Sequence, residues 1–358
     1  MKNKIITISF VFVIELFFIL GLVIKDDSIS KTERRKLESF PKLTINKIMD
    51  GSFMDDFEDY SLDQFPYRDT FRSIKASVNY YVLGKLDNNN IYLNEDGIFK
   101  VEYPTNTESI DKFINKINSI IGILNKDNKV YSLIIPDKNY YVKDKLFLKI
   151  NYDLLYSKIE KLNTTPIDIR DIMNINDYYK TDTHWKQENL DKVVKKLSEK
   201  MDFTYTKLNY KHNNYSKFYG VYYGQAALNG KPDIITYLTN DIINECTVEY
   251  LENPNLNTVY NPSKLTEIDS YDVFLDGASS FITINNPNSK DNRELVVFRD
   301  SFGSSLIPLL IPYYSKITVI DIRYITSDYY LYKIEFTNQD VLFLYSTLLV
   351  NDSSSLKE

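Results

Sequence analysis

Two short segments of the chain contain the side-chain types that nucleophilic catalysis needs. The sequence has two histidines, and one of them, His184, follows Asp182 by two residues in Thr-Asp-Thr-His-Trp. Ser301 stands much later, in Arg-Asp-Ser-Phe-Gly. A serine nucleophile is activated by a histidine whose Nδ1 proton is held by a carboxylate. The pattern therefore predicts Ser301 as nucleophile, His184 as general base and Asp182 as the carboxylate that orients the imidazole.

Each segment also has an ordinary structural explanation. Ser301 precedes an apolar stretch with helical spacing, so it could serve only as a helix N-cap. Asp182 could likewise cap the helix that follows, next to a packed histidine, with Trp185 anchoring that helix. The other histidine, His212, lies in a polar stretch that we expect to be a solvated loop. A metal site is not expected, because two histidines and one cysteine scattered along the chain lack ligand spacing.

The elements that must position these residues alternate along the chain. Helical periodicity predicts helices over 109–125, 152–162 and 186–200, and short apolar runs predict strands at 130–135, 166–169, 294–298, 317–320 and 341–345. Continuous apolar strands separated by helices are typical of a parallel sheet covered on both faces. Ser301 would then lie at the carboxyl end of a strand, where ligand sites of open α/β sheets collect.

The N-terminal residues predict a membrane anchor. After Met-Lys-Asn-Lys, the stretch 5–24 is apolar except for Thr7, Ser9 and Glu15. About 20 apolar residues span the core of a bilayer as a helix, and the preceding lysines favour an N-terminus inside the cell. Because no small-x-small cleavage site follows, we expect an uncleaved signal anchor over 1–25 with the rest of the chain outside. A cleaved signal peptide is the alternative.

The remaining chain is expected to form three regions. A charged juxtamembrane spacer covers 26–50, one extracytoplasmic domain covers 51–351, and a short tail covers 352–358. Within the domain, 51–83 has helical periodicity and 91–99 has the pattern of a hairpin.

Composition excludes some classes of function. The chain of 358 residues is 43% hydrophobic, which is enough material for a sizeable core. Its net charge of −6 argues against a nucleic-acid partner, because such proteins usually carry a basic surface. The single cysteine excludes an intrachain disulfide.

Several segments together resemble the DHHW-motif proteins, a Gram-positive group similar to the SGNH-hydrolase-like alginate O-acetyltransferases. The segments that carry the resemblance are 65–69, 90–97, 179–185, 219–225, 293–305 and 321–324. Together they span most of residues 50–350. Thr183 replaces the second name-giving residue, and the alginate enzymes are similar in having Asp-Thr-His-Trp, so the departure leaves the triad intact.

The resemblance implies an SGNH-hydrolase-like three-layer α/β/α domain with a central, mainly parallel sheet. It implies the catalytic roles already assigned to Ser301, His184 and Asp182. Because Arg299 replaces the glycine of ordinary SGNH esterases, the backbone N–H of Ser301 is the one oxyanion donor that can be named.

The resemblance also implies residues of a substrate pocket. Arg323 falls where the acetyltransferases have a pocket arginine, although it could instead pair with Asp321 or Asp300. Tyr222 and Tyr223 suit stacking on sugar faces, or could serve only in packing. Trp185 and Lys138 are further candidates, Lys138 as part of the pocket rim.

The implied activity is transfer of an acetyl group to a cell-wall or secreted polysaccharide, without a cofactor. Relatives work beside a multi-spanning membrane acyltransferase that exports the acetyl group, so such a partner is expected here. Two alternatives stay open. Water as the acceptor would make the same triad a carbohydrate acetylesterase, and an inherited fold could serve as a non-catalytic glycan-binding or scaffold protein.

Overall fold

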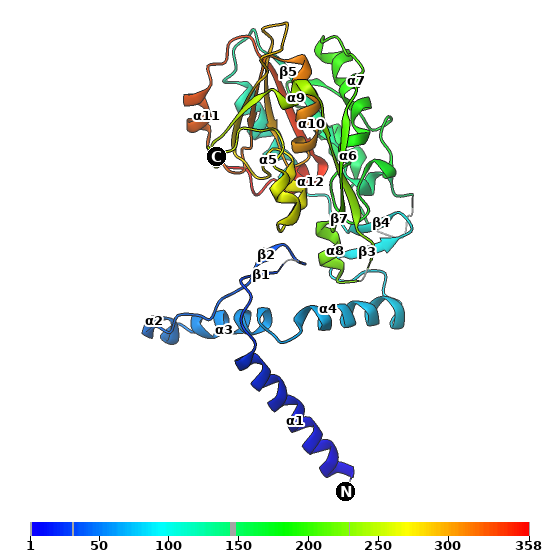
Figure 1. Cartoon of the computed structure of the whole chain (residues 1–358), viewed down its shortest axis with the longest axis vertical. Coiled ribbons are helices and arrows are strands. Elements are labelled where there is room, and N and C mark those ends of the chain that lie inside the picture. The colour runs from blue at the N-terminus through cyan, green and yellow to red at the C-terminus, as the bar shows by residue number, and fades with distance from the viewer. Residues whose placement is uncertain (1, 31, 144–147, 229, 358) are drawn as a thin grey trace. The chain divides into compact units, whose positions relative to one another are not determined.

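The structure, a computed structural model, describes residues 2–30, 32–143, 148–228 and 230–357 (Figure 1). The chain divides into two units. The first unit comprises Met1–Ile91 and Tyr223–Gly230, and the second comprises Tyr92–Tyr222 and Lys231–Glu358.

A mixed sheet forms the centre of the second unit. Within the described residues it has seven strands in the order β6-β5-β13-β11-β12-β10-β9. Their bounds are β5 Lys129–Ile135, β6 Thr165–Pro166, β9 Thr247–Tyr250, β10 Phe281–Asn285, β11 Glu294–Arg299, β12 Lys316–Ile320 and β13 Asp340–Ser346. Strands β6, β5, β13, β11 and β12 pair in parallel, whereas β10 pairs antiparallel with both β12 and β9. The mainly parallel sheet expected from the sequence is confirmed, and the antiparallel edge adds to it.

Helices cover both faces of this sheet. Their bounds are α5 Thr107–Ile121, α6 Tyr152–Ile159, α7 Asp191–Met201, α9 Asp241–Asn244, α10 Gly303–Leu310, α11 Ser327–Lys333 and α12 Thr347–Asn351. Side chains alternate across β13, because successive residues of a strand point to opposite faces. Leu342 and Leu344 join the apolar cluster that contains α7 and α10. Phe343 and Tyr345 join the cluster that contains α5, α6 and α12, so the three-layer α/β/α architecture is confirmed.

Two hairpins and a short helix lie outside the central sheet. The expected hairpin is present as β3 Ile91–Asn94 and β4 Gly97–Lys100. A second hairpin, β7 Lys211–Phe218 with β8 Asp233–Thr239, occupies a region that lacked periodicity, and a short helix, α8, covers Val221–Ala226. The loop expected around His212 was therefore wrong, since His212 pairs with Leu238 in this hairpin, although its side chain is exposed as expected.

The first unit consists largely of helices. They are α1 Lys2–Val23, α2 Ile45–Met49, α3 Ser52–Asp63 and α4 Arg68–Ser77, and α4 continues into a π-helical turn over Val78–Val82. A two-stranded ribbon, β1 Ile29–Ser30 with β2 Arg35–Lys36, follows α1. Helix α1 is long and apolar enough to cross a membrane, by length and composition. Pro66 separates α3 from α4, because the residue before a proline is disfavoured in helical conformation.

Candidate active site

The end of β11 and the start of α10 hold Ser301 in a tight turn. Asp300 fixes this turn, because its Oδ1 accepts the Phe302 N–H at 3.0 Å and its Oδ2 accepts the Ser346 N–H at 2.7 Å. The second bond ties the turn to the end of β13. A Cβ on Gly303 would lie 2.8 Å from the Cβ of Arg299, so the close approach of α10 to β11 requires glycine at this position. Ser301 is partly exposed in this otherwise buried turn.

The three residues predicted to form a triad meet in the structure. The Ser301 Oγ lies 2.8 Å from the His184 Nε2, and the His184 Nδ1 lies 2.6 Å from the Asp182 Oδ1. With the proton on Nδ1 donated to the carboxylate, Nε2 is free to accept the proton of the serine hydroxyl. The His184 side chain is 10% exposed and Asp182 is completely buried. The arrangement is a hydrogen-bonded relay from a partly exposed hydroxyl to an interior carboxylate.

Backbone groups hold the Asp182 carboxylate. Its Oδ1 accepts the His184 N–H at 3.0 Å, and its Oδ2 accepts the Val221 N–H at 2.8 Å. The neighbouring Gly220 passes so close that a Cβ there would lie 2.3 Å from the Thr181 carbonyl oxygen. Gly220 and Val221 thus hold the Asp182 carboxylate in place, a role that the Tyr- and Gly-rich composition of segment 219–225 did not reveal.

Lys138 lies in the interior, next to the turn that carries Asp182 and His184. Its Nζ donates to the carbonyl oxygens of Ile98, Tyr179, Lys180 and Asp182 at 2.7–3.2 Å. The side chain is 1% exposed and packs against the rings of Phe99 and Tyr222. The expected place of Lys138 at a pocket rim was wrong, because segments 98–99 and 179–182 close over the end of β5 and surround the ammonium group.

Burial also changes the acidity of Lys138. Desolvation lowers the pKa of its ammonium group to about 7, and the charges of Asp182, Asp233 and Asp137 oppose the shift. The group therefore changes protonation near neutral pH, next to the turn that carries Asp182 and His184.

Trp185 connects the histidine segment to the serine segment. Its Nε1 donates to the Phe302 carbonyl oxygen at 3.0 Å and to the Ser305 Oγ at 2.9 Å. The ring is completely buried. A direct contact with substrate, expected from the resemblance, does not fit a side chain in this position, and the anchoring alternative describes it better.

Tyr271 packs against the imidazole of His184, and the sequence did not indicate this contact. Its ring stacks on His184 with 3.8 Å between the ring centroids and 9° between the planes. Its hydroxyl donates to the Ser305 Oγ at 2.9 Å, the same oxygen that Trp185 contacts. Tyr271 lies in a tyrosine-rich region without periodicity, so nothing in the sequence distinguished it from the other tyrosines.

The other expected pocket residues have different surroundings. Arg323 forms a two-pronged ion pair with Asp321, at 2.9 Å and 2.6 Å. This pairing is the structural alternative weighed above, and binding of an acyl oxygen stays a prediction. Tyr222 is buried, with its hydroxyl 3.2 Å from the Thr183 Oγ1. Tyr223 belongs to the first unit, and its contact with a sugar stays a prediction.

Among the described residues, no cluster of three or more His, Cys, Asp or Glu side chains could hold a metal ion.

A model of the DHHW protein family matches residues 88–320. No curated protein sequence matches the chain. A DHHW family protein from Eubacterium siraeum is 20% identical, with a TM-score of 0.63, and the match covers 75% of this chain and 94% of that chain. Bacillus cereus PatB1 with a sulfonyl adduct is 18% identical, with a TM-score of 0.59, over 75% of this chain and 95% of that chain.

A third solved structure is more distantly similar to this chain. The O-acetyltransferase domain of Pseudomonas putida AlgJ is 11% identical, with a TM-score of 0.44, over 75% of this chain and 95% of that chain. The two nearer structures share the α/β fold of the second unit.

Proposed function

The chain belongs to the DHHW protein family, and on this premise we propose that it is a membrane-anchored O-acyltransferase that acetylates a cell-surface or secreted polysaccharide. The observation that carries the proposal is the hydrogen-bonded relay of Ser301, His184 and Asp182, with distances of 2.8 Å and 2.6 Å. A relay of this geometry is what acyl transfer through a serine requires.

The first half-reaction would acetylate the enzyme. The Ser301 Oγ attacks the carbonyl carbon of an acetyl ester while its proton moves to the His184 Nε2. The ester bond then breaks, the leaving oxygen takes the proton from Nε2, and acetyl-Ser301 remains. Asp182 stays ionised and stabilises the imidazolium that forms between the two proton transfers. We propose the Ser301 N–H as a donor to the oxyanion.

The second half-reaction would pass the acetyl group to the acceptor. A polysaccharide hydroxyl gives its proton to the His184 Nε2 and attacks the acetyl carbonyl carbon. The bond to Ser301 breaks, and the serine oxygen recovers the proton from Nε2. If water replaces the polysaccharide hydroxyl, the same steps hydrolyse the ester, so a carbohydrate acetylesterase is the alternative for this site.

The N-terminal helix supports a location at the membrane. Helix α1 has 22 residues, lies near the N-terminus, and has the length and composition of a membrane span. A signal sequence can have the same length and composition. We propose that residues 1–25 anchor the chain, that 26–50 form a spacer, and that the domain of residues 51–351 lies outside the cell with 352–358 as its end. A multi-spanning membrane acyltransferase would then supply the acetyl group from the membrane.

Active-site labelling tests the proposal directly. The full chain in detergent should react with a sulfonyl fluoride at Ser301 and should release a burst of nitrophenol from nitrophenyl acetate about equal to the enzyme concentration. Ser301→Ala should abolish both signals, and His184→Ala should slow the burst at least about 10³-fold. His212→Ala is the matched control, because His212 lies exposed on β7, and its burst should equal that of the unaltered chain.

Two outcomes separate the alternatives. A folded chain that neither reacts with the sulfonyl fluoride nor gives a burst would overturn the proposal and favour a glycan-binding scaffold. Once a burst is established, adding oligosaccharide acceptors decides between the two reactions. Acetylated oligosaccharide indicates a transferase, whereas free acetate alone indicates an esterase.

A further inference from the structure

Helix α4 and the π-helical turn that follows it carry exposed apolar side chains. Val82 is 74% exposed and Ile74 is 52% exposed, although both are residue types that folded proteins usually bury. The set that we call the apolar face consists of Phe71, Ile74, Val78 and Val82, and all four side chains are exposed. It extends over α4 and the π-helical turn.

Helix α4 and the π-helical turn have the reverse of the usual arrangement. Ile74, Val78 and Val82 follow one another at a spacing of four residues, so they lie on one side of the helix. The opposite side makes polar contacts within the unit. There the Arg72 guanidinium donates to the Gly224 carbonyl oxygen at 3.0 Å, and the Asn79 amide donates to the Asn88 Oδ1 at 2.7 Å.

In a water-soluble domain a helix turns its apolar side toward the protein and its polar side toward solvent. Helix α4 does the opposite within its own unit. An apolar environment outside the protein would explain this orientation.

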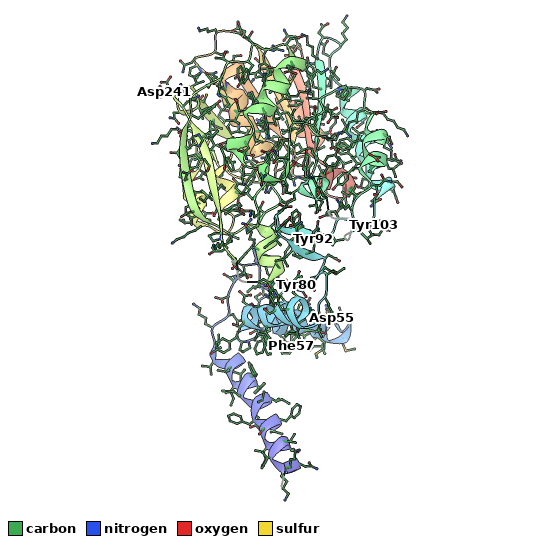
Figure 2. All side chains as sticks on the ribbon, turned by 90° about the vertical axis from the view of Figure 1, so that its right-hand side faces the viewer. Asp55, Phe57, Tyr80, Tyr92, Tyr103 and Asp241 are labelled. Atoms are coloured by element: carbon green, nitrogen blue, oxygen red, sulfur yellow. The ribbon has the colours of Figure 1, made fainter. Side chains whose placement is uncertain are left out.

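The apolar face continues the apolar surface of α1. The ring of Phe17, in α1, stacks on Phe65 at 5.4 Å and contacts Phe71 at 5.6 Å between ring centroids. Just after α1, the Gln64 side chain donates to the Asp27 carbonyl oxygen at 2.9 Å. Helices α3 and α4 therefore meet the chain where the apolar span ends. Figure 2 shows Phe57 on the side of these helices toward α1 and Tyr80 on the opposite side.

We propose that α4 and the π-helical turn lie in the membrane interface, with the apolar face inserted into the boundary between lipid headgroups and acyl chains. Interfacial helices of this kind insert their apolar side by about 5–10 Å. The inference rests on the proposed anchoring of the chain by α1, because the continuity between α1 and the apolar face is what identifies lipid as the occupant.

The charges near the apolar face define the type of lipid surface. Lys75 is exposed on α4, whereas Asp55, Glu58 and Asp59 are exposed on the preceding helix α3, so these helices do not present the basic side that draws helices to anionic lipids. Insertion should therefore depend on burial of apolar side chains, and a neutral phosphatidylcholine surface should suffice.

Depth-dependent fluorescence quenching tests the inference on the full chain. In a Cys246→Ser background, single cysteines at Ile74, Val78 or Val82 carry a bimane label, and the protein is reconstituted into phosphatidylcholine vesicles that contain nitroxide-labelled lipid. A nitroxide near the headgroups should reduce the fluorescence about twofold or more at all three positions, and a nitroxide deep in the acyl chains should reduce it less.

Two further labels make the result interpretable. A label at Phe12, in the middle of α1, should be quenched most by the deep nitroxide. A label at Glu199, exposed near the end of α7 in the second unit, should not be quenched. Replacing part of the phosphatidylcholine by an anionic lipid should leave the pattern unchanged.

The outcomes distinguish this inference from the anchor itself. If Phe12 is quenched but Ile74, Val78 and Val82 are not, the apolar face is covered by protein, and the inference fails while the anchor stands. Disulfide formation between two Ile74→Cys chains in the same vesicles would identify a second copy as the cover. If Phe12 is not quenched either, the anchoring within the proposed function fails.

Discussion

Helices α4 and α7 are both amphipathic, and they face opposite ways. In α7, Val193 and Leu197 are completely buried and join the cluster under the central sheet. In α4, Phe71 and Ile74 are exposed, and Arg72 is on the side that contacts the protein. The periodicity of the two sequences is alike, yet one helix turns its apolar side inward and the other outward.

The difference shows what periodicity does and does not specify. It defines a helix with two unlike sides, because positions three and four residues apart share a face. The neighbouring segments decide which side is covered. Strands of the central sheet offer apolar side chains to α7, whereas segments 32–36 and 223–228 offer α4 the Glu33 carboxylate and the Gly224 carbonyl oxygen.

Truncating one apolar residue in each helix should give the largest contrast. Leu197→Ala should lower the free energy of unfolding of the second unit by about 2–5 kcal/mol, because it leaves a cavity under the sheet. Ile74→Ala should change stability by no more than about 0.5 kcal/mol, because about half of this residue is exposed and its truncation leaves no enclosed cavity. Urea unfolding followed by the fluorescence of Trp185, the single tryptophan, measures the second unit.

Hydrogen exchange over residues 68–82 measures the first unit in the same samples. A loss of protection in Ile74→Ala as large as that caused by Leu197→Ala in its own helix would show that the apolar face is packed against protein. The comparison between the two helices would then be invalid.

The alternating elements of the second unit could be predicted from the sequence. Apolar runs such as 294–298 and 341–345 are buried on both faces in a parallel sheet, so each strand appears as a continuous apolar segment. The antiparallel strand β10, which lies between β12 and β9, was missed, because Phe281, Thr283 and Asn285 are only half-buried and alternate with buried isoleucines, which gives a weaker pattern.

The three side chains of the proposed triad could be selected from the sequence because the chain offers few choices. Two histidines are present, and one has a carboxylate two residues away. The groups that hold them could not be predicted, because each comes from a segment distant in sequence. The Val221 N–H, the Tyr271 ring and Lys138 hold these groups only because the fold places them there. Backbone N–H groups, aromatic rings and lysines occur throughout this sequence, so the sequence did not single these three out.

The two units also differ in how deeply their polar side chains are buried. Lys138 of the second unit and Arg72 of the first both donate to backbone carbonyl oxygens, but Lys138 is buried whereas Arg72 is partly exposed. Lys138→Met should cost about 1–3 kcal/mol, because buried carbonyl oxygens lose their donor. Arg72→Met should cost at most about 1 kcal/mol, since its partners are partly exposed to water. Trp185 fluorescence in urea measures the first variant, and hydrogen exchange over 68–82 measures the second.

The pH dependence of the Lys138 effect has a defined sign. Burial lowers the pKa of Lys138 to about 7 from 10.5, so between these values the unfolded chain binds a proton that the folded chain releases. Stability of the unaltered chain should rise across this window by up to about 1.4 kcal/mol per pH unit from this group. Because Lys138→Met lacks the titration, its deficit should widen from pH 7 to 9. A deficit that stays constant would place the ammonium group in contact with water.

The smallest effect is expected for the charge cluster of the first unit. Burial favours the neutral form of Glu33, but contacts with Arg68, Arg72 and Arg35 outweigh it and lower the pKa of the carboxyl group. The stabilisation is therefore present above the usual carboxyl pKa and is lost as pH falls through the lowered value.

Glu33→Gln should reduce protection of residues 68–79 at pH 7 by about 0.2–1 kcal/mol, as expected for a partly exposed ion pair. High salt should shrink this difference, because it screens exposed charges, whereas the deficit of Lys138→Met should persist. If the Glu33 effect equals that of Lys138 and resists salt, the first unit holds its polar groups as rigidly as the second. The inward-facing polar side of α4 would then be enough to fix its orientation without a membrane.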